Sequence, residues 1–156
     1  SYITTINGKS MKLSTRARYG IRALLDLSIN GAKGPVPLKE IAERQEISMS
    51  YLEHLINPMV AGGLIRTVRG SKGGIILVKT PGEIKLSQIV NLLEGSTAPV
   101  DCVDSPQNCL RSEDCVTREV WLQFKEAIDD VLDSITLQTL IERQKNRQKT
   151  VDMFYI

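Results

Sequence analysis

The sequence predicts a mainly α-helical fold with a small β-hairpin wing: a winged helix-turn-helix followed by a long C-terminal dimerisation helix. Three observations support this fold class. Apolar residues recur at helical spacing in several separate stretches, two short β-prone runs flank a glycine-rich turn, and a basic first half precedes an acidic second half. At 156 residues, with 42% hydrophobic residues, the chain has the size and composition of one globular domain.

The first predicted helix lies in the stretch STRARYGIRALLDLSIN. The hydroxyl of Ser14 can cap its N-terminus, and Gly31 is expected to end it. Spacings of three and four indicate a buried apolar face, made of Ala17, Ile21, Leu24, Leu25 and Ser28. Three arginines lie mostly on other faces, where solvated charge and phosphate contact are both open interpretations: Arg16, Arg18 and Arg22.

Two short helices with a tight connection follow, which is the outline of a helix-turn-helix. Apolar stripes define both helices: Leu38, Ile41 and Ala42 in the first, and Leu52, Leu55, Ile56 and Met59 in the second. Ser48 or Ser50 can cap the second helix. Ser50 and Glu53 also have the spacing of a capping box, so a structural role competes with ligand contact at both serines.

The predicted wing is the stretch LIRTVRGSKGGIILVKT. Two β-prone runs, Leu64–Val68 and Ile75–Val78, flank glycines that allow a tight reversal. A basic hairpin directly after a helix-turn-helix indicates binding to double-stranded DNA. The charge distribution agrees, because residues 11–79 carry eleven Lys/Arg and five Asp/Glu, whereas residues 80–156 carry eight and thirteen.

A third helical stripe runs from Leu86 to Leu93 and is closed by Gly95. After an aperiodic stretch, a long amphipathic helix repeats at three and four through Val120, Trp121, Phe124, Ile128, Val131, Leu132 and Ile135. Its apolar face can pack on its own domain or on the same helix of a second chain. We favour a homodimer, since symmetric dimers suit palindromic DNA sites. Thr136 is expected to cap a last helical piece, Leu137 to Ile141, before the polar tail frays.

The chain therefore divides into a winged-helix DNA-binding domain (11–95), a cysteine loop (96–117), a dimerisation helix (118–145) and a tail (146–156). Residues 1–10 lack the pattern of a signal peptide, and we expect them to be foreign to a native chain that starts at Met11. No apolar run approaches the roughly 20 residues that a membrane helix needs, so we expect no membrane partner and a cytoplasmic, reducing setting.

All three cysteines, Cys102, Cys109 and Cys115, fall in CVDSPQNCLRSEDC. In a reducing compartment such clusters indicate metal binding or redox chemistry, and soft thiolates favour iron–sulfur, zinc or copper(I). The spacing is not that of zinc fingers or plant-type ferredoxins, and three free thiols are the alternative. The chain's only histidine, His54, lies in the second helix of the helix-turn-helix, and the sequence shows no catalytic motif. We therefore expect no enzyme.

The stretches MKLSTRARYGIRALLDL, IAERQEISMSYLEHLI and GLIRTVRGSKGGIIL, with the three-cysteine loop, resemble the iron–sulfur cluster regulators of the IscR and NsrR type. The likeness covers residues 11 to about 141. It implies a homodimeric winged-helix transcription regulator that holds a 2Fe–2S cluster and binds a palindromic operator.

The resemblance also implies roles for individual residues. Ser48, Ser50 and Glu53 match positions that read base edges, Tyr51 matches a backbone contact, and Arg69 matches the wing arginine of the minor groove. The three cysteines match the cluster ligands. These roles agree with the hydrogen-bonding capacity of Ser and Glu in the major groove and with the preference of narrow minor grooves for Arg.

The sequence departs from this family at the fourth cluster ligand. Arg118 stands where IscR has a histidine, and Arg18 and Arg22 stand where NsrR and a related sensor use an acid or His. Guanidinium is always protonated and ligates poorly. The candidates left are a small thiol or one of several acids: Asp26, Asp101, Asp104, Glu113, Asp114 and Glu119. The first cysteine spacing is also one residue longer than usual.

Two alternatives stay open. A cluster-free regulator of the same fold would respond through thiol redox chemistry or a partner protein. A zinc-stabilised protein-interaction module would have no role on DNA.

Overall fold

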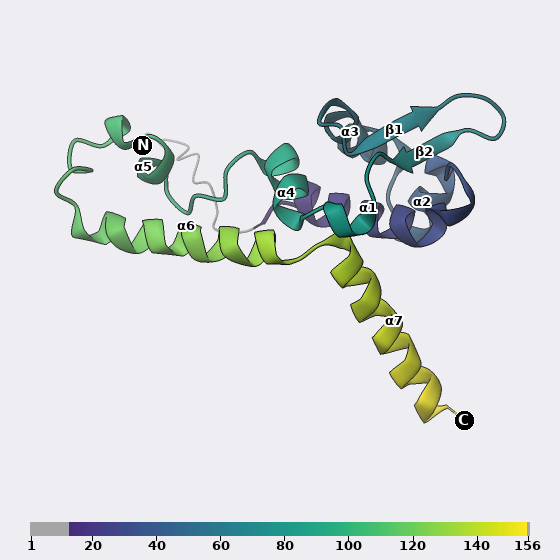
Figure 1. The fold of residues 1–156 in the computed structure, drawn as a ribbon. Coiled ribbons are helices and arrows are strands. Elements are labelled where there is room, and N and C mark those ends of the chain that lie inside the picture. Colours follow the sequence, from purple (N-terminus) through teal and green to yellow (C-terminus); the bar gives the residue numbers. More distant parts are fainter. Residues whose placement is uncertain (1–12, 156) are drawn as a thin grey trace, which may run out of the picture.

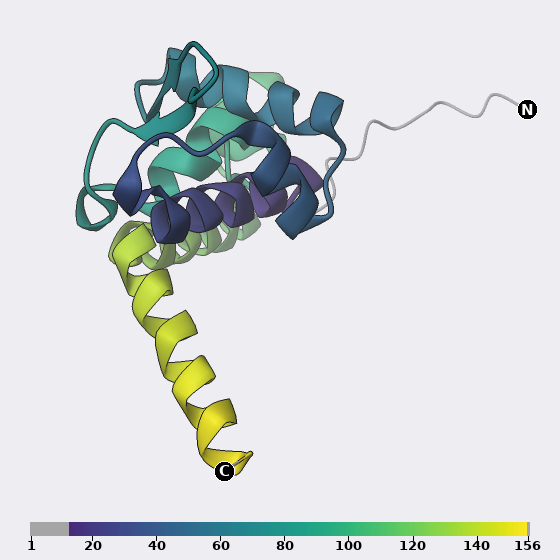
Figure 2. The ribbon, with the colours of Figure 1, turned by 90° about the vertical axis from the view of Figure 1, so that its right-hand side faces the viewer.

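The computed structural model describes residues 13–155, so the expectation for residues 1–10 lies outside the described residues. Figure 1 shows a helical head that carries a β-hairpin, with two helices, α6 and α7, leaving it in different directions. The view turned by 90° shows α7 projecting from the head as a separate arm (Figure 2).

Helix α1 (Thr15–Asn30) begins as predicted, because the Ser14 hydroxyl accepts a hydrogen bond from the backbone N–H of Ala17 at 3.3 Å. It ends at Gly31, the start of the short 3-10 helix η1 (Gly31–Lys33). The predicted apolar face was only partly right. Ala17 and Leu24 are buried, but Ile21, Leu25 and Ser28 are half-buried, whereas the centre of the buried face contains Ala23, Asp26 and Leu27.

Helices α2 (Leu38–Gln45) and α3 (Met49–Ala61) form the helix-turn-helix and both pack against α1. Between them, Glu46 takes a left-handed conformation, with φ of 54°. The chain then reverses so that the Ile47 N–H donates to the Ala42 carbonyl at 2.9 Å, and the Ile47 side chain enters the core. The predicted helix-turn-helix is thus confirmed.

The wing consists of β1 (Ile65–Val68) and β2 (Gly74–Leu77), paired antiparallel with Val68 opposite Gly74. These limits agree with the predicted strands to within one residue. Val36 extends the hairpin by an isolated bridge to Ile75, with N–H···O distances of 3.0 and 2.9 Å. Gly74 is required at this contact, since a Cβ there would lie 2.2 Å from the Val36 carbonyl oxygen.

Beyond the wing, the 3-10 helix η2 (Pro81–Glu83) leads into α4 (Leu86–Glu94), which packs against α1 and α3. The contact with α1 is close, because a Cβ on Gly20 would lie 2.2 Å from Leu93 Cδ1. The predicted stripe of α4 is buried, and Gly95 ends the helix with φ of 85°. These contacts close the core of the head.

The aperiodic stretch contains two short turns, α5 (Asp101–Asp104) and the 3-10 helix η3 (Pro106–Asn108), and precedes α6 (Val116–Ser134). Helix α7 (Leu137–Phe154) begins at Thr136, whose hydroxyl accepts from the Thr139 N–H at 3.2 Å, as predicted for this cap. At the junction, the Leu86 N–H donates to the Ile135 carbonyl at 2.9 Å and the Leu137 N–H donates to the Ile84 carbonyl at 3.0 Å.

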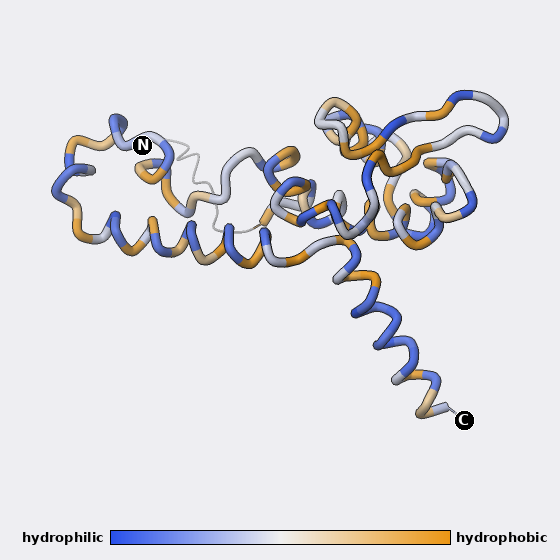
Figure 3. Tube along the Cα trace, in the orientation of Figure 1, coloured by the Kyte–Doolittle hydropathy of each residue, from blue (hydrophilic) through white to orange (hydrophobic). Residues whose placement is uncertain are grey.

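The expectation that the chain frays after Ile141 was wrong, since α7 continues to Phe154. The residues beyond Ile141 are mainly Glu, Arg, Gln and Lys, which are strong helix formers even without an apolar stripe. Figure 3 shows most of this part of α7 as hydrophilic, with hydrophobic residues only near its C-terminal end. Among the described residues, no helix is both long and apolar enough to cross a membrane.

Candidate DNA-binding surface and cysteine loop

The N-terminus of α3 presents the predicted base-reading residues to solvent. Ser48 is the cap, because its hydroxyl accepts from the Tyr51 N–H at 3.2 Å, so the choice between Ser48 and Ser50 is decided. The Ser48 hydroxyl proton can still donate to another acceptor. Ser50 lies in the first turn of α3 and Glu53 follows directly after that turn; both are exposed, which leaves both side chains accessible to a ligand.

Tyr51 is half-buried and lies edge-on to Tyr19 of α1, with ring centroids 6.1 Å apart. The Arg22 guanidinium lies 4.8 Å from the Tyr19 ring centroid. Arg22 also donates to the side-chain and backbone oxygens of Gln45, at 3.1 and 2.9 Å. Arg22 therefore joins α1 to the end of α2. This structural role adds to solvated charge and phosphate contact, the two interpretations that the sequence left open for Arg22.

The turn of the hairpin carries Arg69, whose side chain is exposed, next to Gly70 with φ of 107°. Arg66 and Lys72 are exposed on the same hairpin, so its surface is basic. In Figure 1 the hairpin and α3 lie on the upper side of the head, whereas α7 leaves from the opposite side. The structure therefore brings the predicted recognition helix and wing to one side of the molecule.

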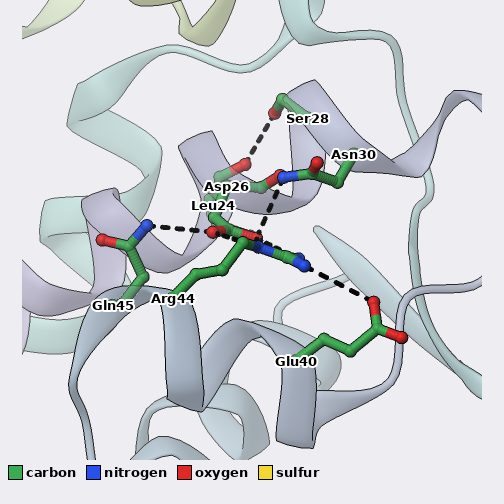
Figure 4. Close-up of polar contacts among 7 residues, drawn as sticks. All are labelled: Leu24, Asp26, Ser28, Asn30, Glu40, Arg44 and Gln45. Carbon is green, nitrogen blue, oxygen red and sulfur yellow. Dashed lines mark hydrogen bonds and ion pairs between the residues drawn. The ribbon is translucent and has the colours of Figure 1, made fainter.

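Asp26 is a buried charged residue that sequence reasoning offered as a cluster ligand. Its carboxylate accepts from Arg44 Nη2 at 2.7 Å, from Arg44 Nε at 3.0 and 3.2 Å, and from Gln45 Nε2 at 2.9 Å (Figure 4). The hydrogen bond to Asp26 also raises the pKa of Arg44. Both carboxylate oxygens are thus engaged inside the head, and Asp26 is occupied as a link between α1 and α2.

Side-chain contacts attach the cysteine loop to α6. Thr97 donates to Asp129 at 2.6 Å, and the same carboxylate pairs with Lys125, also at 2.6 Å. Arg118 Nε donates to the backbone carbonyl of Cys102 at 3.1 Å. The spacing of Lys125 and Asp129 could have been found in the sequence as an i, i+4 ion pair, but the Arg118 contact crosses the loop and has no local signal.

Cys115 is half-buried and occupies the N-cap position of α6. The pKa of its thiol is lowered from its ordinary value, chiefly by the Thr117 hydroxyl 3.1 Å away and then by the backbone N–H of Arg118. Cys102 is also half-buried, whereas Cys109 is exposed. Cys115 therefore forms a thiolate more readily than an ordinary cysteine does.

Three soft thiolates are a suitable donor set for an iron–sulfur cluster. In the described part of the chain, however, no three His, Cys, Asp or Glu side chains lie close enough together to hold a metal ion. Arg118, at the position of the family's histidine, is directed at a carbonyl. The residues as arranged do not form a ligand shell, so a cluster would require a different arrangement of the loop.

The exposed side of α6 carries an uncovered apolar strip. Phe124, Ala127, Ile128, Val131 and Leu132 line an apolar cavity of about 320 Å³. Phe124 and Val131 are 46% and 57% exposed, which is unusual for large apolar side chains in the middle of a helix.

A winged helix-turn-helix with an accessible recognition helix and a basic wing defines the class of DNA-binding transcription regulators. The family profile of Rrf2, described as an iron-dependent transcriptional regulator, matches residues 13–143, and the chain belongs to this family.

Relatives support the assignment. The chain is 36% identical to the HTH-type transcriptional regulator CymR of Bacillus subtilis, over 94% of this chain and all of CymR. It is 35% identical to IscR of Pectobacterium carotovorum, over 86% of this chain and 82% of IscR. The structure of T. potens IscR matches with a TM-score of 0.73 and 39% identity, covering 88% of this chain and 90% of that chain. These relatives are transcriptional regulators, in agreement with the expectation that the chain is no enzyme.

Proposed function

We propose that the chain is a homodimeric transcription regulator whose affinity for a palindromic operator is controlled through the cysteine loop, with a 2Fe–2S cluster as the cofactor. Ser48, Ser50 and Glu53 contact base edges, Tyr51 contacts the DNA backbone, and Arg69 enters the minor groove. Ser50, Glu53 and Arg69 are exposed, and α3 and the hairpin that carry them lie on one side of the head (Figure 1), which supports these roles. The second copy covers the apolar strip of α6.

The observation that carries the regulatory part is the position of α6. Its N-terminus directly follows Cys115, and its C-terminus is tied to the head by the backbone bonds of Ile135 to Leu86 and of Leu137 to Ile84. A helix of 19 residues spans about 28 Å. A rearrangement of the loop would therefore tilt α6 and shift one winged head relative to the other, and a difference of ~1–3 kcal/mol in DNA binding suffices for control.

Anaerobic purification followed by absorption spectroscopy and by iron and sulfide analysis tests the cofactor. We expect a coloured protein with iron and sulfide in equal amounts, which loses both in a variant with all three cysteines changed to Ala. A colourless, iron-free protein after anaerobic reconstitution would remove the cluster from the proposal. In the cluster-bound protein, the thiolate ligands would be Cys102, Cys109 and Cys115.

Direct thiol sensing is the second candidate, and the lowered pKa of Cys115 favours it. Among similar structures, B. subtilis CymR is the global cysteine regulator of that organism, and the structure of Staphylococcus aureus CymR is known in an oxidized form. Iron-free protein whose operator binding changes on thiol oxidation, but not in the triple Ala variant, would support this candidate. If the wild type and the triple Ala variant bind the operator equally well, before and after thiol oxidation, the signal would instead come from a partner protein.

A gel shift at several salt concentrations would distinguish the regulator from a zinc-stabilised interaction module. Its DNA binding would be absent, whereas a regulator should bind its operator with an affinity that falls steeply as salt rises.

A further inference from the structure

The cysteine loop makes much of its own backbone structure. Ser105, Asn108, Cys109, Ser112 and Asp114 each donate their N–H to a carbonyl within the loop. The Ser112 hydroxyl, which is buried, also donates to the Pro106 carbonyl at 2.7 Å. These bonds hold the turns of the loop together, but they do not determine where its first half lies relative to α6.

The Arg118 side chain supplies a connection across the loop. Arg118 lies in the first turn of α6, three residues after Cys115, and is half-buried. Its Nε donates to the Cys102 carbonyl at 3.1 Å, where α5 packs against α6. One hydrogen bond thus ties the backbone of the first cysteine to the helix that begins at the third.

We propose that Arg118 is a positioning residue that closes the cysteine loop and sets the distance between Cys102 and Cys115. The biological role of this contact rests on the proposed function, because the contact would set the position of Cys102 relative to Cys115. Guanidinium is always charged and is a directional donor, so the contact persists across the physiological pH range. Arg118 acts through the carbonyl of Cys102 and needs no contact with a bound group.

Hydrogen exchange of the full-length protein, kept reduced and treated with a chelator, tests the role of Arg118. Arg118→Met keeps the alkyl chain and removes the donors. We expect amides of residues 101–109 to exchange roughly threefold to tenfold faster, as for the loss of one charge-assisted hydrogen bond at a half-buried site. Arg118→Lys, which keeps the charge and a donor, should recover part of the protection.

Arg111→Met is the matched control, since it removes a cation that also acts electrostatically on Cys115. We expect wild-type exchange in residues 101–109 of this variant, and unchanged exchange of α1 and α4 in all three variants. Equal loop exchange in Arg118→Met and Arg111→Met would overturn the proposal. Faster exchange of α1 in Arg118→Met would do the same, because it would reveal a general loss of stability.

A second readout measures the thiols themselves. In a Cys109→Ser background, a short bis-maleimide should link Cys102 to Cys115 within one chain, and adding Arg118→Met should lower the linked fraction severalfold. An unchanged fraction would overturn the positioning role. Neither measurement uses metal or DNA, so a failure of the cluster proposal in the iron and sulfide analysis would leave this test decisive.

Discussion

Arg44→Met should destabilise the head far more than an ordinary surface change. The substitution leaves the Asp26 carboxylate, whose side chain is 3% exposed, without its cationic partner. Removing one member of a fully buried pair costs ~3–5 kcal/mol. The Arg44 side chain is 38% exposed and Gln45 still donates to Asp26, so we expect a smaller loss of about 2–3 kcal/mol.

Urea unfolding followed by circular dichroism at a fixed protein concentration measures this loss. Lys39→Met is the control in the same helix, because the Lys39–Glu43 pair is 3.9 Å long and both side chains are largely exposed. Its expected cost is below ~0.5 kcal/mol. In the double variant Asp26→Asn, Arg44→Met, the cost should fall short of the sum of the single costs by ~1–2 kcal/mol.

A cost for Arg44→Met no larger than that of Lys39→Met would refute the argument that the Asp26–Arg44 pair joins α1 and α2. Additive single and double variants would refute it as well. Asp26→Asn also tests whether Asp26 is a cluster ligand, since folded protein of this variant should retain the iron content of the wild type if Asp26 only joins α1 to α2. Loss of iron without loss of stability would restore Asp26 as a candidate ligand.

Four further changes have defined outcomes. Arg69→Ala should weaken operator binding about tenfold in a gel shift and lower the salt slope by about one, whereas Lys145→Ala on the projecting arm should change neither. Phe124→Ser should shift the protein toward monomer in sedimentation, and an unchanged dimer would argue against the α6 strip as the interface. Glu46→Gly should stabilise the protein by ~0.5–1 kcal/mol in urea unfolding, because glycine adopts the left-handed conformation without cost. Deleting residues 144–156 should leave the melting temperature unchanged, whereas deletion from Leu137 onward should lower it, since Leu137 and Ile141 are 0% and 7% exposed.

The elements that were predicted correctly depend on signals that lie close together in the sequence. A serine or threonine cap marks the start of α1 and α7, apolar spacing marks α2, α3 and α4, and glycines mark the turn of the wing. The extension of α7 was missed for the same reason. The part of α7 beyond Ile141 has no continuous apolar stripe, so periodicity gives no sign of it although most of its residues favour the helix.

The contacts that were missed join residues that are distant in sequence. Asp26 and Arg44 are 18 positions apart, and Cys102 and Arg118 are 16 apart across an aperiodic loop. Nothing in the local pattern of either residue distinguishes a buried link from a ligand or a solvated charge. The residue types therefore predicted which groups the loop offers, namely three thiols and arginines that cannot act as ligands. They did not predict the long-range contacts that position these groups.

Arg118 stands at the position where the resemblance to IscR predicts the fourth cluster ligand, and its role differs from that of a ligand. At the end of the loop a histidine could contribute only one bond to a metal, and an arginine contributes none. By binding the Cys102 carbonyl, however, Arg118 brings the first cysteine to the first turn of α6, whose far end is bonded to the head through Ile135. In the proposed regulation, a change in loop structure that breaks this bond would loosen α5 from the first turn of α6, while Thr97 still binds Asp129 and the C-terminus of α6 stays attached to the head. Under the proposed function, Arg118 would therefore connect the position of the thiols to α6 without acting as a ligand itself.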